Sequence, residues 1–477
     1  MPANQSLWQI LREPVLAETR ANLARSWARV PEQLRTPHQM LGRGGNGCGA
    51  TIGALPRCDF ACVGCYLGEE ANTIPPLSVE AVKEQMRRLR PSLGNAGNLQ
   101  LTDGELTLRP EAELIELLRY AQSLRLIPML MTHGDTFRRR PGLLERLVVD
   151  GGLVEVSIHI DTTQRGRLGD AYRLARTEEE LMPLREEFAD MIRAVSRRTG
   201  RPLRAATTMT VTADNLAGVP AVVRWLARNA DAFRLISFQP IAQVGRTLDG
   251  LGGGASVEAL WEKIAEGLDG PGATPQRLER GLMWLGHPGC NRYLAGVVSR
   301  QENETPRFHP MRTDGDPMDR RAVDGFLLRF GGVSFRLDSP VEKLTRIAAL
   351  VLREPAFLLG TAGAYLRTWL GRFDGLHPWR FAWRLLTGRA RVNGLVIVSH
   401  HFMSREEALS PVGQERLGLC VFNVAIGDQL VPMCEVNALG VREKFYEELR
   451  TKTPRTRSLP VATSMPERRP VRARPDA

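Results

Sequence analysis

The sequence lacks the features of several special classes of protein. No apolar run approaches the roughly 18 residues that a membrane span needs, and the first residues have no basic start followed by an apolar core. We therefore expect no secretory signal and a cytoplasmic protein. Cysteine is scarce and odd in number, seven in 477 residues, which argues against a disulfide framework. What remains, 43% hydrophobic and 25% charged residues, is the composition of a globular chain with a sizeable core.

Positive charge is in excess, but it is concentrated in two segments. The formal net charge is +11, and residues 353–391 and 451–477 each contribute +5, from seven basic and two acidic residues. The rest of the chain is nearly neutral, which argues against a broad nucleic-acid groove, so we expect no specific nucleic-acid partner. Residues 451–477, with five prolines and no apolar periodicity, predict a disordered basic tail.

Three of the seven cysteines lie within eight residues. Cys58, Cys62 and Cys65 have the spacing Cys-x3-Cys-x2-Cys, which places three thiolates on one tight loop. Such a loop suits a soft metal or an iron–sulfur cluster, whereas a structural zinc site normally shows four ligands in two pairs. Chance clustering and a partial zinc knuckle are the alternatives.

A second motif lies about 40 residues downstream. Together with the cysteine spacing, the sequence Leu101-Thr-Asp103-Gly104-Glu105 resembles the radical S-adenosylmethionine (radical SAM) superfamily. The cysteines match the family's cluster motif, and the second segment is similar to its Gly-Gly-Glu motif, with Asp103 in place of the first glycine. One departure is Gly64, because the residue before the third cysteine is usually aromatic in the family and lies near the adenine.

The resemblance implies an enzyme that reductively cleaves S-adenosylmethionine at a 4Fe–4S cluster and abstracts a hydrogen atom from a substrate. It also implies a reducing electron donor such as flavodoxin or ferredoxin. The cluster ligands would be the three cysteines of the loop, and Tyr66 would take part of the missing aromatic role. The residues that we expect to bind the cofactor are Tyr66, Asp103, Gly104, Glu105, Ser157 and Thr208.

The sequence around these motifs alternates between strand and helix patterns. Strand-like runs occur near 51–56, 98–102, 127–132, 153–160, 204–212 and 233–239, with helical stretches between them. This alternation predicts an α/β fold, a partial (β/α)6 TIM-like barrel with a C-terminal α+β extension. We expect a helical lead-in at 1–47, the barrel at 48–245, the extension at 246–450 and the tail at 451–477.

Polar residues mark where the barrel's site would lie. In the run 153–160, apolar residues alternate with Glu155, Ser157 and His159, and we expect the polar set to point into the barrel lumen, although a half-exposed edge strand would give the same pattern. His133, Asp135 and Gln239 stand at or just beyond predicted strand ends, where such barrels place their chemistry.

Three late cysteines, Cys290, Cys420 and Cys434, are candidates for an auxiliary iron site. They could be joined by Cys48, with His400 and His401 as further candidate ligands, to hold a cluster or a mononuclear iron. The segment from Cys420 to Cys434 predicts a β-hairpin turning at Gly427-Asp428, which would bring its two cysteines together. The alternative is that these are buried thiols in a packed domain.

The basic segment 353–391 also holds three of the eight tryptophans, Trp369, Trp379 and Trp383. This pattern predicts amphipathic helices suited to an anionic membrane surface; the alternative is a core-facing helix pair with a solvated arginine face. We therefore expect a lipid or lipid-linked substrate and peripheral membrane contact. The alternatives are a peptide- or protein-modifying enzyme of the same family and a non-enzymatic zinc- or nucleic-acid-binding protein.

Overall fold

The computed structural model describes residues 6–249, 254–268, 274–301, 304–313, 316–373 and 377–452. The predicted tail therefore lies almost wholly outside the described residues. Eleven described strands form one sheet in the order β11-β10-β1-β2-β3-β4-β5-β6-β9-β7-β8. The strands are β1 (Cys48–Ala50), β2 (Asn98–Leu101), β3 (Ile127–Thr132), β4 (Glu155–His159), β5 (Arg204–Val211), β6 (Phe233–Pro240), β7 (Asn291–Gln301), β8 (Arg307–Pro310), β9 (Ala390–His400), β10 (Phe422–Ile426) and β11 (Gln429–Pro432).

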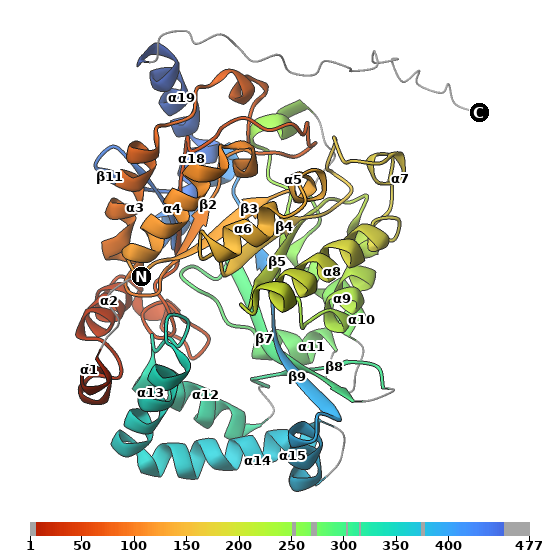
Figure 1. Ribbon diagram of the computed structural model, residues 1–477. Helices are drawn as coiled ribbons and strands as arrows, with labels where there is room; N and C mark the ends of the chain where they lie inside the picture. The colour runs from red at the N-terminus through yellow and green to blue at the C-terminus, as the bar shows by residue number, and fades with distance from the viewer. Residues whose placement is uncertain are drawn as a thin grey trace.

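The sheet is mainly parallel and curls into a partial barrel (Figure 1). Strands β10, β1 to β6 and β9 are parallel neighbours, while β11, β7 and β8 pair antiparallel at the two ends. The predicted α/β fold with a partial barrel is thus confirmed. The predicted hairpin is also present, with Gly427 in the turn at φ +56°. The extension contributes strands to both edges of the same sheet.

The first strand begins earlier than predicted. It covers Cys48–Ala50, and the expected run 51–56 is loop. The reason lies in the backbone donors: the Ile52 N–H binds Gln85 Oε1 at 3.0 Å, and the Gly53 N–H binds the carboxylate of Asp103. With these donors committed to side chains, the ladder with β2 ends and the chain turns toward the cysteine loop.

Helices cover the outer face of the barrel. Helix α3 (Val79–Leu93) begins as predicted at Ser78, whose Oγ accepts the Ala81 N–H at 3.2 Å, and ends at Gly94 with φ +72°. The other barrel helices are α4 (Glu111–Ser123), α5 (Asp135–Arg139), α6 (Leu143–Val149), α7 (Asp170–Arg173), α8 (Met182–Thr199) and α9 (Val219–Arg228). Of these helices, α3, α4, α6, α8 and α9 each bury an apolar stripe.

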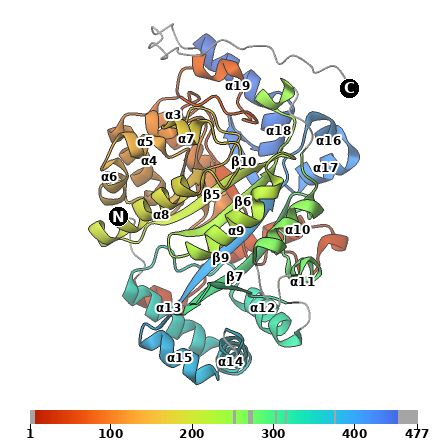
Figure 2. The same ribbon diagram turned by 90° about the vertical axis from the view of Figure 1, so that its right-hand side faces the viewer.

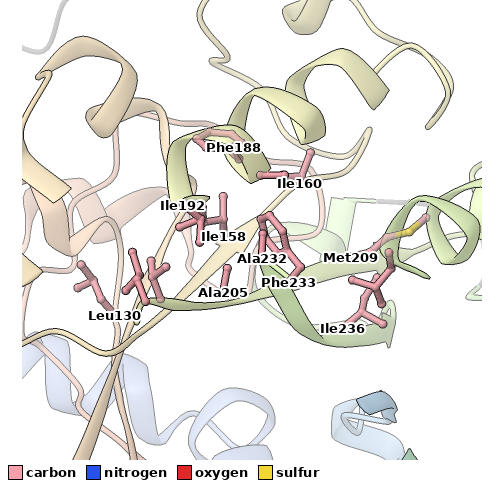
Figure 3. Packing of buried hydrophobic residues seen from close by; sticks show 14 of the residues in the cluster. Leu130, Ile158, Ile160, Phe188, Ile192, Ala205, Met209, Ala232, Phe233 and Ile236 are labelled. Atoms are coloured by element: carbon pink, nitrogen blue, oxygen red, sulfur yellow. The ribbon is translucent and has the colours of Figure 1, made fainter. Parts of the chain in front are cut away.

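The main core lies between the sheet and these helices. Figure 3 shows Ile158 of β4 beside Ile192 of α8, and Met209 and Ile236 of the next two strands together; with Phe188 they belong to one cluster. All five side chains are buried. The outward-facing residues of β4 are therefore the apolar ones, as the alternation predicted, and its polar residues face the lumen.

The remaining helices belong to the lead-in and the extension. Short 3-10 turns occur along the chain, in the barrel as well as outside it, at Glu32–Leu34, Glu69–Thr73, Leu106–Leu108, Leu216–Gly218 and Gly245–Asp249. The helices are α1 (Leu7–Arg12), α2 (Ala17–Ala28), α10 (Val257–Leu268), α11 (Pro275–Gly281), α12 (Pro317–Phe330), α13 (Pro340–Arg353), the π-helical η6 (Ala356–Ala362), α14 (Gly363–Arg372), α15 (Pro378–Leu386), α16 (Arg405–Leu409), α17 (Pro411–Gly418), α18 (Met433–Ala438) and α19 (Val441–Lys452).

Helices α12 to α15 gather at one end of the molecule, where β7 and β9 project beyond the barrel (Figures 1 and 2). Helix α1 packs against α13 in this group. Among the described residues, no single helix is long and apolar enough to cross a membrane. One bent pair, Pro340–Arg353 with Ala356–Arg372, reaches that length and composition only jointly, across a bend of 95°.

Candidate active site

A cavity of about 220 Å³ opens at the carboxyl ends of the parallel strands, the end of an α/β barrel that normally carries chemistry. Its wall includes all three cysteines of the predicted cluster loop. Of the predicted cofactor-binding residues, five also line it: Tyr66, Gly104, Glu105, Ser157 and Thr208. His133 and Gln239, expected at strand ends, and His159, expected in the lumen, also line it, whereas Asp135 is buried and does not.

The cysteine loop runs between β1 and α3 and is held by the segment that follows β4. The N–H groups of Ala61 and Val63 donate to the carbonyls of Arg165 and Thr163, both at 2.9 Å. The Cys58 N–H donates to Asn72 Oδ1, also at 2.9 Å. These bonds fix the loop from both sides, so the direction of the three thiols is set by backbone contacts before any metal binds.

The backbone conformation of Gly64 favours glycine. It has φ +91°, and a Cβ at this position would lie 2.9 Å from Ile241 Cδ1. Ile241 follows β6 and lines the cavity, so an apolar side chain from another strand occupies the space beside the glycine. Tyr66 also lines the cavity, with its hydroxyl 3.5 Å from Thr102 Oγ1 and the Arg442 guanidinium over its ring.

Burial and mutual repulsion keep the three thiols protonated in the protein alone. Burial, followed by the charge of Cys65, raises the pKa of Cys62 to about 12. Burial and then Glu105 and Cys62 raise the pKa of Cys58, and burial also raises that of Cys65. Binding a metal that needs thiolates must therefore release protons here, and the bound cation supplies the stabilisation that the pocket lacks.

Glu105 is the acidic group of the cavity, and its position is fixed by the end of β3. Its carboxylate accepts the Thr132 hydroxyl at 2.6 Å and the His133 N–H at 2.8 Å. Its own N–H donates to the Arg57 carbonyl at 2.9 Å, beside the cysteine loop. Gly104 is required next to it, because at φ +79° a Cβ would lie 2.2 Å from the Leu55 carbonyl oxygen.

Asp103 does not take the position that the resemblance implied. We expected it to anchor the methionine end of the cofactor, but it does not line the cavity and is 1% exposed. Its carboxylate instead accepts hydrogen bonds from the Arg442 guanidinium, from the Tyr446 hydroxyl at 2.7 Å and from the Gly53 N–H. Asp103 thus ties helix α19 to the loop that carries Gly104.

Asp59 and Phe60 lie between the first two cysteines of the motif, but the cysteine spacing alone did not predict their contacts. Phe60 stacks on His133 with ring centroids 3.8 Å apart, and His133 Nε2 lies 2.8 Å from Asp59 Oδ1. Burial opposes ionisation of Asp59, but His133 and Arg139 outweigh it and lower the pKa of Asp59 to about 2. Cys58, Asp59 and His133 place ligand atoms within 4.8 Å of one another, so a stray cation could compete here with the expected cluster.

Strands β4 and β5 contribute polar residues to the cavity lining. Ser157 Oγ and Thr208 Oγ1 are 3.5 Å apart. His159 Nε2 lies 2.5 Å from Asp161 Oδ2, and although burial alone would raise it, His159 lowers the pKa of Asp161 to about 2. Ser157, His159 and Thr208 give the cavity polar side chains, whereas Asp161 is buried behind them and does not line it.

Hydrogen bonds occupy ring nitrogens of both histidines that we considered as further metal ligands. His400 Nδ1 lies 2.8 Å from Ser237 Oγ and its Nε2 lies 3.3 Å from the Tyr293 hydroxyl, so both of its ring nitrogens have partners. Burial lowers the pKa of His400 to about 4. His401 follows the end of β9, and its Nε2 is 2.9 Å from Ser399 Oγ. His400 is thus engaged at both nitrogens, and His401 at one.

Comparison with known proteins identifies the barrel. A model of the radical SAM superfamily matches residues 54–219. This part of the chain is a radical SAM domain. The chain is 24% identical over 198 residues to 7,8-dihydro-6-hydroxymethylpterin dimethyltransferase of Methanocaldococcus jannaschii, a match that covers 41% of this chain and only 37% of that relative. Among solved structures, Streptococcus suis SuiB bound to precursor peptide SuiA matches with a TM-score of 0.34 at 12% identity, over 51% of this chain and 48% of SuiB.

The family implies a 4Fe–4S cluster and S-adenosylmethionine, and the radical SAM domain offers fitting residues. Three thiols share one wall of the cavity, and no fourth cysteine of the described chain lines it. A cubane held by three thiolates keeps one iron open for a small molecule. Glu105, Ser157 and Thr208 supply the polar groups that such a molecule needs. The match also favours an enzyme over the zinc- or nucleic-acid-binding alternative.

Removing the carboxylate of Asp103 should destabilise the fold. We expect Asp103→Gly to lower the free energy of unfolding by about 3–5 kcal/mol, because Arg442 stays charged and buried without its partner. Glycine accepts the φ of +103° found at this position, so backbone strain cannot explain the loss. Urea denaturation measures it.

The double variant Asp103→Gly/Arg442→Met should recover most of that loss, since no unpaired charge remains. The matched control is Asp190→Asn, which removes an exposed partner of Arg193 at 3.1 Å and should change stability by about 0–1 kcal/mol. Strictly additive losses in the double variant would contradict the coupling.

Proposed function

We propose that this protein is a radical SAM enzyme whose substrate is a lipid or a lipid-linked molecule. The cavity supports the first part of the proposal, and one observation carries the second. Helices α12 to α15, at one end of the molecule (Figure 1), expose many apolar side chains, and basic residues lie among them. The alternative is that the enzyme modifies a peptide or protein. Membrane association belongs to the lipid proposal and not to this alternative.

In the proposed reaction, the cluster and S-adenosylmethionine supply the chemistry, and the protein side chains hold them in place. When bound, a 4Fe–4S cluster supplies the electron that cleaves S-adenosylmethionine to methionine and a 5′-deoxyadenosyl radical. Cys58, Cys62 and Cys65 would each bind one of its irons. Glu105 lies where its carboxylate can bind the methionine amino group, and the hydroxyls of Ser157 and Thr208 can bind polar groups of the nucleoside. The electron comes from a reducing protein such as flavodoxin or ferredoxin.

Part of the cavity wall is apolar. It includes Met131, Ile241, Val244, Phe402 and Phe422. Apolar contacts around a bound cofactor displace water and so protect a reactive intermediate. The same wall offers apolar contact to a hydrocarbon segment of a substrate, which suits abstraction from an unactivated C–H bond.

Exposed apolar side chains concentrate on α1 and α12 to α15, which we call the apolar face. Fourteen of the 23 large hydrophobic side chains exposed in the described part of the chain lie there, which is far more than a monomer scatters by chance. They are Leu7, Trp8, Leu11, Phe326, Leu328, Val341, Leu344, Ile347, Leu352, Leu359, Leu366, Trp379, Trp383 and Leu386.

Helix α15 illustrates the orientation of the apolar face. Trp379, Trp383 and Leu386 follow at helical spacing and are 70%, 64% and 82% exposed, whereas Phe381 on the other side is buried against Phe373. The helix therefore has apolar residues on both sides, unlike a core-facing helix with a solvated arginine face. Tryptophan and arginine together suit the headgroup level of an anionic membrane.

The apolar face lies far from the cavity, and this separation constrains the substrate. Strand β9 begins at Ala390, in the apolar cluster beneath α15, and ends at His400, beside cavity residues. Ten steps of about 3.3 Å give roughly 33 Å between these ends. A headgroup at the membrane surface cannot reach the cavity, so the reacting carbon must belong to a part of the substrate that leaves the membrane plane.

Anaerobically reconstituted protein should convert S-adenosylmethionine to 5′-deoxyadenosine and methionine when dithionite is added. Cys58→Ala should reduce deoxyadenosine to background, because the cluster loses one of its three thiolates. Liquid chromatography with mass detection measures the product. Ser123→Ala, exposed and outside the cavity, is the control and should retain the activity. Binding of zinc in place of iron and sulfide, with no deoxyadenosine, would overturn the assignment.

The apolar face should bind anionic vesicles at low salt. We expect each of Arg380→Gln, Arg389→Gln and Arg391→Gln to weaken binding about fivefold, since a basic residue near the surface contributes about 1 kcal/mol. Trp379→Ser/Trp383→Ser should weaken it further by removing apolar contact. Vesicle sedimentation measures binding.

Leu409→Ser/Val412→Ser is the matched control, because these side chains are 59% and 58% exposed but lie outside the apolar face. Loss of all binding on deletion of 453–477 alone would contradict the assignment to the helices. Mass spectrometry of lipids and peptides from cells with and without active protein tests the substrate itself. A product found only among peptides favours the alternative.

A further inference from the structure

The four cysteines outside the radical SAM motif come from distant parts of the chain. Cys48 begins β1, Cys290 precedes β7, Cys420 precedes β10 and Cys434 lies in α18. None lines the cavity, none forms a disulfide, and each is largely buried. Hydrogen bonds and strand pairing nevertheless bring the segments that carry these four cysteines close together.

The pairing of β1 with β10 brings Cys48 close to Cys420. Strand β1 pairs with β10 so that Cys48 lies opposite Phe422, and the Cys48 N–H donates to the Val421 carbonyl at 2.9 Å. Cys420 is the residue before Val421. Its sulfur also accepts the N–H of Met433, the residue before Cys434. The hairpin of β10 and β11 thus places Cys420 and Cys434 together, with Cys48 beside them.

Cys290, the fourth cysteine, contacts Arg416 and the residue after β9. The Arg416 Nε lies 3.5 Å from Cys290 Sγ, and the His401 N–H donates to the Cys290 carbonyl at 2.8 Å. Arg416 lies in α17, and the Cys420 N–H bonds the Leu417 carbonyl at 3.0 Å. Cys290 therefore sits against the same turn that carries Cys420.

The hairpin register places the last pair. Asn423 of β10 lies opposite Pro432 of β11. Cys420 and Cys434 stand three and two residues from this pair, both on the side away from the turn at Gly427. Cys434 therefore lies near the turn that carries Cys420.

We propose that Cys48, Cys290, Cys420 and Cys434 bind a second 4Fe–4S cluster, held by four cysteines. The spacing favours a cluster over one metal ion. Tetrahedral zinc with bonds of about 2.3 Å needs sulfurs about 3.8 Å apart, and no three of these four described sulfurs lie within 4.8 Å of one another. The same is true of the three radical SAM cysteines. With both clusters present, all seven cysteines have a role.

The second cluster would lie directly behind the cavity wall. Phe422 and Met433 line the cavity, and they stand two residues and one residue from Cys420 and Cys434. Because four thiolates occupy every iron, such a cluster has no open position for substrate, and it suits electron transfer or a structural role. N–H donors from Met403 and Met433, with the Arg416 guanidinium, are the groups that would set its potential.

Iron and sulfide content of the full-length chain tests the proposal without any need for activity. Reconstituted wild-type protein should hold about eight irons and eight sulfides, and Cys58→Ala/Cys62→Ala/Cys65→Ala should keep about four of each, with a reduced 4Fe–4S signal by electron paramagnetic resonance. Loss of all iron in this triple variant, or zinc in its place, would overturn the second cluster. Because the triple variant cannot cleave S-adenosylmethionine, the result is independent of the proposed function.

Variants that keep all four ligands avoid the problem of misfolding. In the triple-variant background, Arg416→Ala should lower the reduction potential of the remaining cluster, because it removes a positive charge and a donor near Cys290. Arg405→Ala, exposed on the neighbouring α16, is the matched control and should leave the potential unchanged. A redox titration followed by electron paramagnetic resonance measures both. An unshifted potential in Arg416→Ala would place the cluster elsewhere.

Discussion

A curled sheet of six parallel strands has two unpaired edges, and the rest of this structure depends on how they are covered. Exposed edges present rows of unmet backbone donors and acceptors. Here the C-terminal extension supplies β10 and β11 beside β1, and β9, β7 and β8 beside β6. The extension is therefore part of the barrel's sheet. The same pairings place Cys420 beside Cys48 at one edge and carry β9 from the cavity to the apolar face at the other.

The buried contact between Asp103 and Arg442 makes the end of the extension part of the cofactor loop. Burial alone would lower the pKa of Arg442, but Asp103 outweighs it and raises that pKa, so the guanidinium stays charged. The same guanidinium lies over Tyr66, next to Cys65. A single arginine from α19 thereby joins the acidic motif and the cysteine loop, two segments that must keep a fixed geometry for one cofactor.

Local patterns predicted much of this site, and long-range partners account for the rest. The cysteine spacing, the helix start at Ser78 and the alternation around Ser157 each depend on near neighbours, so the sequence was enough. The role of Asp103 depended on Arg442, 339 residues away. Arg442 and Tyr446 are four residues apart and lie on one face of a helix, but this spacing does not predict that their partner is Asp103. The true position of β1 likewise depended on Gln85 and Asp103 taking its donors.

The extension has three structural features that truncation would remove together. It closes both sheet edges, it brings three of the four thiols of the proposed second cluster, and it presents the apolar face. Removing it would expose β1 and β6, leave Asp103 buried without Arg442, and separate Cys48 from Cys420. The barrel of this chain is thus incomplete without its extension, and this explains why membrane contact, the second cluster and the cofactor loop must be tested by point substitutions in the full chain.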